Sequence, residues 1–116
     1  MFEEKRKNKR ISLSLPTYYE PLETDRKVHL NTVSKDISEG GIRLAFSKFY
    51  PPKTKFLLKI TLEGINKVIE PLAEIVWSFN TQFSNSYYSG LRFLEMAPSQ
   101  QETLREYIEI REITKT

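Results

Sequence analysis

The stretch DISEGGIRLAF, residues 36–46, joins a turn signal to a strand signal. Aspartate, serine and paired glycines are typical of a tight connection, because Asp and Ser side chains bond nearby backbone and glycine tolerates positive φ. Apolar and more polar residues then alternate, with Ile42, Leu44 and Phe46 against Arg43 and Ala45. This period of two predicts a half-buried β-strand that follows a tight turn.

The same alternation recurs on both sides of this stretch. It covers residues 11–15, 28–30, 56–62, 69–79 and about 87–94. Residues 63–67 form a turn signal, and Pro71 favours a bulge or an edge position within the strand that follows. Six short strands with no helix between them predict an antiparallel sheet closed into a small β-barrel.

The C-terminal segment has a different period. Pro98 ends the last strand, Ser99 and Glu102 have capping-box spacing, and Leu104, Tyr107 and Ile108 recur at helical spacing. The predicted fold is therefore all-β with one terminal helix, a six-stranded antiparallel barrel capped by a C-terminal α-helix. The 116 residues fit one domain, with the barrel at 10–96 and the helix and tail at 97–116.

The composition excludes several classes of function. The chain has no cysteine, and His29 is its one histidine, which excludes disulfide scaffolds, thiol nucleophiles and the usual zinc sites. Without a nucleophile and base pair, we expect no catalytic residues, no enzymatic activity, no metal and no cofactor. No apolar leader or run of about 18 apolar residues is present, so we expect a cytoplasmic protein without membrane insertion.

The net charge of +3 lies at the N-terminus. Residues 1–10 hold five basic and two acidic groups, and the remainder holds thirteen of each. We therefore expect residues 1–9 to form a flexible basic arm whose partner is anionic.

Two short clusters have side chains suited to a nucleotide. One is RKNKR, residues 6–10, an R-x-x-x-R, and the other is D-x-S-x-x-G at 36–41. The arginine fork of Arg6 and Arg10 can pair with phosphate oxygens or with guanine O6 and N7. Ser38 can donate and accept, and Gly41 can let a base approach the backbone. Asp36 can accept from the Watson-Crick edge of a guanine or can hold an arginine, and the sequence does not choose between these roles.

In this order, the two motifs resemble those of the PilZ domain, a bacterial receptor family for cyclic di-GMP (c-di-GMP). Residues 40–44, 73–77 and 88–93 resemble further strands of that family, so the likeness covers nearly all of residues 5–112. It implies a six-stranded barrel with a terminal helix. It also implies that c-di-GMP binds at Arg6, Arg10, Asp36, Ser38 and Gly41.

Other residues are secondary candidates. Lys5 lies at the position that, in the PilZ family, influences whether one ligand or a stacked pair is bound, and Gly40 and Arg92 are further candidate contacts. Trp77 shares its phase with Ile75 and Phe79, which favours a place in the core or at the barrel rim over a role as a base-stacking platform. Two tyrosine pairs, at 18–19 and 87–88, are expected to be exposed near loops and available to a partner.

The functional prediction is a c-di-GMP receptor. The ligand would bridge the arm 1–9 to the turn 36–41, and the altered surface would signal to an unidentified downstream protein in motility or biofilm regulation. One alternative is a PilZ-like adaptor that binds no nucleotide. Another is a small barrel that binds single-stranded nucleic acid, which is unlikely on charge because the predicted barrel has no net excess to follow a phosphate backbone.

Overall fold

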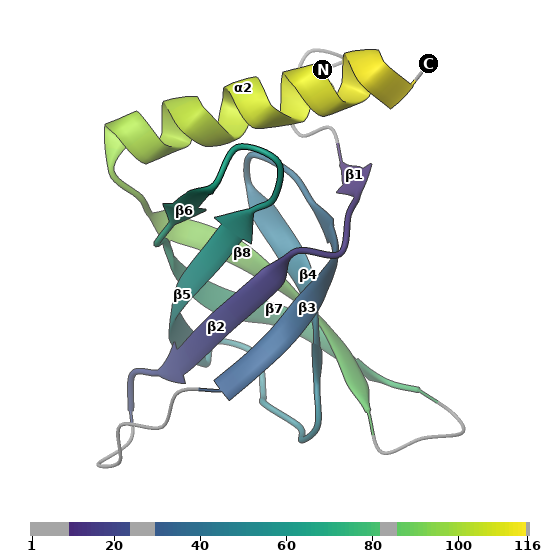
Figure 1. Ribbon diagram of the computed structural model, residues 1–116. Helices are drawn as coiled ribbons and strands as arrows, with labels where there is room; N and C mark the ends of the chain where they lie inside the picture. Colours follow the sequence, from purple (N-terminus) through teal and green to yellow (C-terminus); the bar gives the residue numbers. More distant parts are fainter. Residues whose placement is uncertain (1–9, 24–29, 82–85, 116) are drawn as a thin grey trace, which may run out of the picture.

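The computed structural model describes residues 10–23, 30–81 and 86–115 of the chain (Figure 1). It contains eight strands followed by one helix. These are β1 (Ile11–Ser12), β2 (Pro16–Pro21), β3 (Leu30–Ile37), β4 (Gly41–Phe46), β5 (Lys55–Leu62), β6 (Lys67–Ile69), β7 (Leu72–Asn80), β8 (Tyr87–Glu95) and α2 (Pro98–Lys115). The predicted barrel with one terminal helix is confirmed, with β1 and β6 as two short additional strands.

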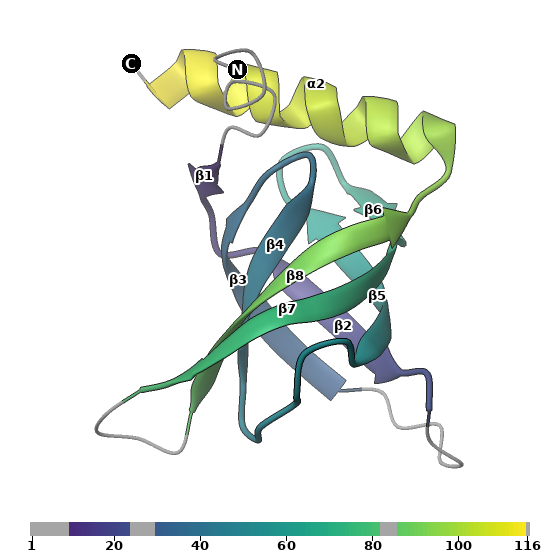
Figure 2. The ribbon, with the colours of Figure 1, turned by 180° about the vertical axis from the view of Figure 1, so that it is seen from behind.

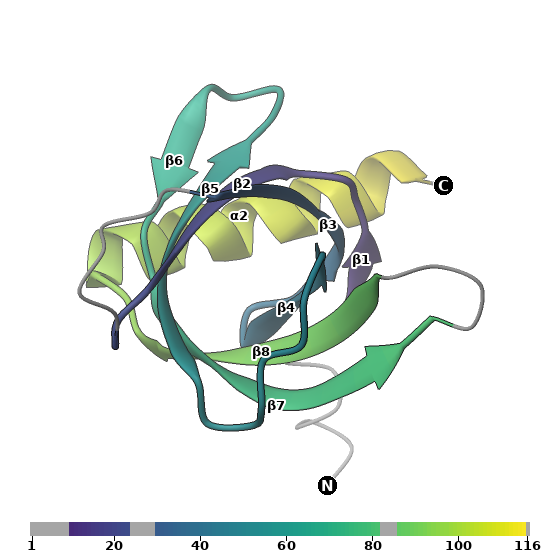
Figure 3. The same cartoon turned by 90° about the horizontal axis from the view of Figure 1, so that it is seen from below.

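Six antiparallel strands form the closed barrel, which Figure 3 shows end on. Their order is β3-β2-β5-β7-β8-β4, and β4 returns to pair with β3. Closure pairs both edges of the sheet and removes the open edges that an unclosed sheet would expose. β1 pairs with β3 and β6 pairs with β5 outside this ring.

The core fills the inside of the barrel, as the period-two pattern predicts. Along β5, Phe56, Leu58, Ile60 and Leu62 are all buried, whereas the residues between them face outward. On β2, Tyr19 is buried with its ring 4.8 Å from that of Phe46. The expectation that both members of its tyrosine pair are exposed is therefore wrong for Tyr19, because residues 16–21 form a strand in the barrel wall and not a loop.

Helix α2 lies across one end of the barrel (Figures 1 and 2). Leu104, Tyr107 and Ile108 are its buried residues, and the Tyr107 hydroxyl donates to the Glu63 carbonyl at 2.8 Å. The predicted capping box is wrong, because Pro98 is already helical and the Ala97 carbonyl accepts the first helical hydrogen bonds. Proline suits this first position, where its missing N-H would have had no helical partner.

A β-bulge changes the phase of β7. Ile75 pairs with Leu91 and Trp77 pairs with the adjacent Gly90, so Val76 is an extra residue without a partner. After the bulge, Trp77 and Phe79 point out of the barrel and are 40% and 64% exposed. Of the two places predicted for Trp77, the core is therefore wrong, because the bulge reverses its phase relative to Ile75.

The β7–β8 hairpin continues beyond the barrel wall as a projecting ribbon (Figure 2). At the other end of β7, Pro71 lies in the break between β6 and β7, both of which pair with β5. In the part of the chain that the structure describes, no helix is long and apolar enough to cross a membrane.

Candidate functional site

The turn between β3 and β4 is closed by Ser38. Its backbone N-H donates to the Gly41 carbonyl at 2.8 Å, and its hydroxyl accepts from the Gly40 N-H at 3.3 Å. The Gly40 carbonyl in turn accepts from the Phe93 N-H of β8 at 2.9 Å. Because Ser38 is 1% exposed, its side chain stabilises the turn from inside the fold.

Neither glycine of the turn, Gly40 or Gly41, has a positive φ, although positive φ is one reason for glycine in such turns. A Cβ on Gly41 would lie 2.2 Å from the Leu91 carbonyl oxygen of β8, closer than any carbon can approach. Gly41 therefore allows β4 and β8 to pair closely, which is a packing role in addition to the predicted role of admitting a base.

Asp36 lies beside this turn and binds two arginines. Arg10 Nη1 donates to Asp36 Oδ1 at 2.7 Å, and Arg43 Nε donates to Asp36 Oδ2 at 2.5 Å. Arg43 is the cross-strand partner of Asp36 in the β3–β4 hairpin. The carboxylate side chain is 3% exposed, whereas the arginines are 46% and 36% exposed. Of its two predicted roles, the geometry favours Asp36 as the residue that holds arginines.

The electrostatics of this cluster favour an ionised Asp36. Burial raises the pKa of Asp36, but hydrogen bonds from Arg43 and Arg10, together with their charges, outweigh burial and lower the pKa below its ordinary value. Asp36 correspondingly raises the pKa of Arg43. One carboxylate between two guanidinium groups leaves a formal charge of +1. Each guanidinium keeps N-H donors beyond those used by Asp36, and these can serve an anion.

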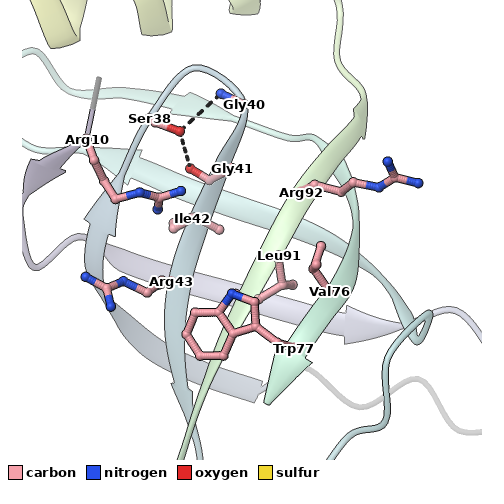
Figure 4. Close-up of a pocket in the computed structure, with 11 residues that line it drawn as sticks. Arg10, Ser38, Gly40, Gly41, Ile42, Arg43, Val76, Trp77, Leu91 and Arg92 are labelled. Carbon is pink, nitrogen blue, oxygen red and sulfur yellow. Dashed lines mark hydrogen bonds between the residues drawn. The ribbon is translucent and has the colours of Figure 1, made fainter. Parts of the chain in front are cut away.

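A groove of about 670 Å³ lies next to these arginines on the outer face of β4, β7 and β8. Arg10 and Arg43 lie on one side of the groove in Figure 4, and Trp77 lies across Gly90 on the other. A Cβ on Gly90 would be 2.4 Å from Trp77 Nε1, so glycine is what lets the indole lie against β8. The groove therefore combines an aromatic surface with two oriented guanidinium groups.

Arg92 borders the same groove but is already paired. Its Nη2 lies 2.8 Å from Glu74 Oε2, and its side chain is 63% exposed. In Figure 4 its guanidinium points away from Arg10 and Arg43. In this arrangement Arg92 is a residue of the rim, and a direct ligand contact would require it to leave Glu74.

Most of the described candidates converge on one place. Arg10, Ser38, Gly40, Gly41 and Arg92 line the groove, and Asp36 lies directly behind the two arginines. Lys5 and Arg6, the arm 1–9 to which they belong, and His29 lie outside the described residues.

The sequence reasoning missed six groove residues: Ile42, Arg43, Val76, Trp77, Gly90 and Leu91. Arg43 had a usable signal, since a turn at 38–40 makes residues 36 and 43 near partners across the hairpin. The alternation of apolar and polar residues gave no signal for Trp77 and Val76, because no distinctive sequence marks the extra residue of a bulge.

The fold and the groove together define a small β-barrel domain with a cationic binding groove. The PilZ domain family model matches residues 4–109, and the chain belongs to this family. The resemblance found in the motifs is thus confirmed. No curated protein matches the chain in sequence.

Solved structures with the same fold include three that are informative. The inhibitor of motility MotI/DgrA of Bacillus subtilis superposes with a TM-score of 0.80 at 26% identity, over 95% of this chain and 52% of its own, so the chain spans about half of that protein. The PilZ domain of YcgR from Escherichia coli, solved with c-di-GMP, superposes with a TM-score of 0.64 at 16% identity, over 97% of this chain and 98% of its own. The PilZ domain of CeSA from a cellulose-synthesizing bacterium superposes with a TM-score of 0.60 at 15% identity, over 89% of this chain and 98% of its own.

Proposed function

We propose that this chain is a receptor for c-di-GMP that binds the nucleotide in the groove beside Asp36. PilZ domains form a family of c-di-GMP receptors and adaptors, and one structure with this fold, the YcgR domain, was solved with c-di-GMP. The observation that carries the proposal is the cluster in which buried Asp36 holds Arg10 and Arg43 at the edge of the groove. Oriented guanidinium groups suit the phosphates and guanines of this ligand.

The proposed mechanism couples the ligand to the N-terminal arm. Arg10 is the described end of the R-x-x-x-R motif, and the ligand would draw Arg6 and the rest of residues 1–9 toward the turn 36–41. This would neutralise a positive arm and create a new surface, through which the receptor would signal to a partner protein. The likeness to an inhibitor of motility supports motility as the regulated process. We assign no catalytic step, cofactor or metal to the domain.

The test is calorimetric titration of the purified protein with c-di-GMP, with cyclic di-AMP as the control for the base. Saturable binding is expected for c-di-GMP alone. We expect Arg10→Ala to weaken it by about 2 kcal/mol or more, the scale for removing one partner of a charge pair at an interface. The double variant Arg6→Ala/Arg10→Ala should weaken it further.

Two matched variants separate the site from general charge. Arg10→Lys keeps a cation beside Asp36 but loses the planar fork, so its affinity should fall between wild type and Arg10→Ala. Arg105→Ala removes an exposed arginine that pairs with Glu102 on α2 and should leave the affinity unchanged. Equal affinity in Arg10→Ala and wild type would contradict the site. No binding of wild type in calorimetry or equilibrium dialysis would leave a PilZ-like adaptor that binds no nucleotide.

A further inference from the structure

An exposed apolar surface continues from the groove along the projecting β7–β8 hairpin. Ala45 of β4 pairs with Tyr88 of β8, and Tyr88 pairs with Phe79 of β7. On the far side of β4, Ser34 of β3 pairs with Leu44. Because the two strands are antiparallel, the next position along brings Val33 opposite Ala45. Val33, Ala45, Tyr88 and Phe79 thus lie in a row across four strands, and we refer to them as the aromatic band.

The two ends of the aromatic band are exposed to solvent, and Ala45 and Tyr88 between them are half-buried. Phe79 is 64% exposed and Val33 is 50% exposed, whereas residues of the opposite phase in these strands, such as Leu44, are buried. The bulge at Val76 accounts for Phe79, because in a regular strand residues 75, 77 and 79 would all point to the same face as buried Ile75. A contiguous apolar surface of this kind marks a site of interaction.

The charges around the aromatic band are cationic. Lys35 Nζ lies 4.8 Å from the centre of the Tyr88 ring. Arg43 is two residues from Ala45 along β4 and lies at the groove end of the band. The row of Trp77 and Gly90 separates the band from Glu74, which is paired with Arg92. The nearer carboxylate, Asp36, is buried behind Arg10 and Arg43. An apolar centre with cations at its edge complements a surface that has apolar side chains beside carboxylates.

We propose that the aromatic band is the docking surface for a protein partner that presents apolar side chains flanked by Asp or Glu. The proposal rests on the proposed function in one respect, since it names the surface through which the receptor would signal. A second copy of this chain fits less well, because two-fold pairing would bring Lys35 and Arg43 against the same cations of the other copy. Single-stranded nucleic acid also fits less well, because a groove that tracks a phosphate backbone needs cations along its length, whereas the described cations lie near one end of the band, at Lys35 and at the cluster of Arg10 and Arg43.

The test selects peptides from a library of random short peptides displayed on phage, with the full chain as bait, in the presence and absence of c-di-GMP. We expect enriched peptides that combine aromatic or aliphatic residues with Asp or Glu. Synthetic peptides from the selection should bind wild type and bind Phe79→Ser about tenfold or more weakly. The control is Val68→Ser, which changes an apolar residue that is 45% exposed on β6 and should bind like wild type.

Further measurements keep the result decisive. Phe79→Ser should unfold at nearly the wild-type temperature and bind c-di-GMP with unchanged affinity, since Phe79 is not among the residues that line the groove. A failure of the wild type to bind c-di-GMP would thus overturn the proposed function without affecting the peptide result. The docking proposal is overturned by peptides without acidic residues, by no enrichment, or by equal binding to Phe79→Ser. Two further outcomes would also overturn it. If the wild type self-associates in sedimentation and Phe79→Ser does not, the occupant is a second copy of the chain. If the wild type binds oligothymidylate and Phe79→Ser does not, the occupant is single-stranded nucleic acid.

Discussion

At the scale of single residues, two arginines whose charges repel each other share the buried carboxylate of Asp36. Asp36→Asn keeps the shape of the side chain but removes the charge that holds both guanidinium groups. We expect it to lower the free energy of unfolding by about 1 to 2 kcal/mol at neutral pH, a modest value because both arginines are partly exposed. Urea unfolding of the two proteins at pH 7 measures this difference.

The same pair of proteins gives a pH dependence with a definite sign. The pKa of Asp36 in the folded protein is lower than its ordinary value of 3.8, so the unfolded chain binds the proton more tightly. The stabilisation is therefore present above about pH 4 and is lost as the pH falls through the lower pKa of the folded state. The difference between wild type and Asp36→Asn should shrink in urea titrations at acid pH. A difference that does not change with pH would show that charge is not the cause.

Two glycines of neighbouring strands should differ in their tolerance of alanine. A Cβ on Gly41 meets the backbone carbonyl of Leu91 at 2.2 Å, whereas a Cβ on Gly90 meets the half-exposed indole of Trp77. Backbone in the barrel wall cannot move aside, but the indole can rotate outward. We expect Gly41→Ala to cost about 3 kcal/mol and Gly90→Ala about 1 kcal/mol in chemical unfolding. Equal costs would contradict this reading, and a changed fluorescence of Trp77 in Gly90→Ala would support it.

At the scale of elements, helix α2 covers the barrel end with three buried side chains, of which Leu104 is the least exposed. Leu104→Ala should lower the free energy of unfolding by about 2 to 5 kcal/mol, because it removes buried apolar atoms and leaves a cavity between helix and barrel. The matched control is Ile110→Ala on the same helix, which is 56% exposed and should stay within about 0.5 kcal/mol of wild type. Urea unfolding followed by circular dichroism tests both, and similar losses would show that α2 does not seal the core.

The sequence predicted β4, β5 and β8 close to their observed bounds. Of the alternating residues 11–15, however, only Ile11–Ser12 form a strand, and β3 continues to Ile37, well beyond the predicted 28–30. β4 and β5 follow the pattern throughout. β2 was missed because prolines at both of its ends are typical of turns, although Tyr19 faces the core. The groove was also only partly predictable, because some of its residues are close in sequence and others are brought together by strand pairing. Asp36, Ser38 and Gly41 lie in one local motif, but Trp77 depends on a pairing between β7 and β8 that only the folded sheet defines.

At the scale of the whole molecule, barrel and helix share one core. Leu104, Tyr107 and Ile108 of α2 belong to the same buried cluster as Ile42 and Ile75 of the barrel. We therefore expect a single cooperative unfolding transition. The fluorescence of Trp77, which reports on the sheet, and the ellipticity of α2 at helical wavelengths should change together across a urea titration. A helix transition at lower urea than the fluorescence transition would show that α2 is a separate cooperative unit.

The unpaired Val76 has a consequence for how related chains are aligned. One additional residue in β7 lets Trp77 and Phe79 face outward although they are spaced two and four residues from buried Ile75. A relative that pairs these strands without the bulge has one residue fewer between its equivalents of Ile75 and Trp77. An alignment of this strand should therefore place a gap at Val76, so that inward positions are compared with inward positions and outward positions with outward ones.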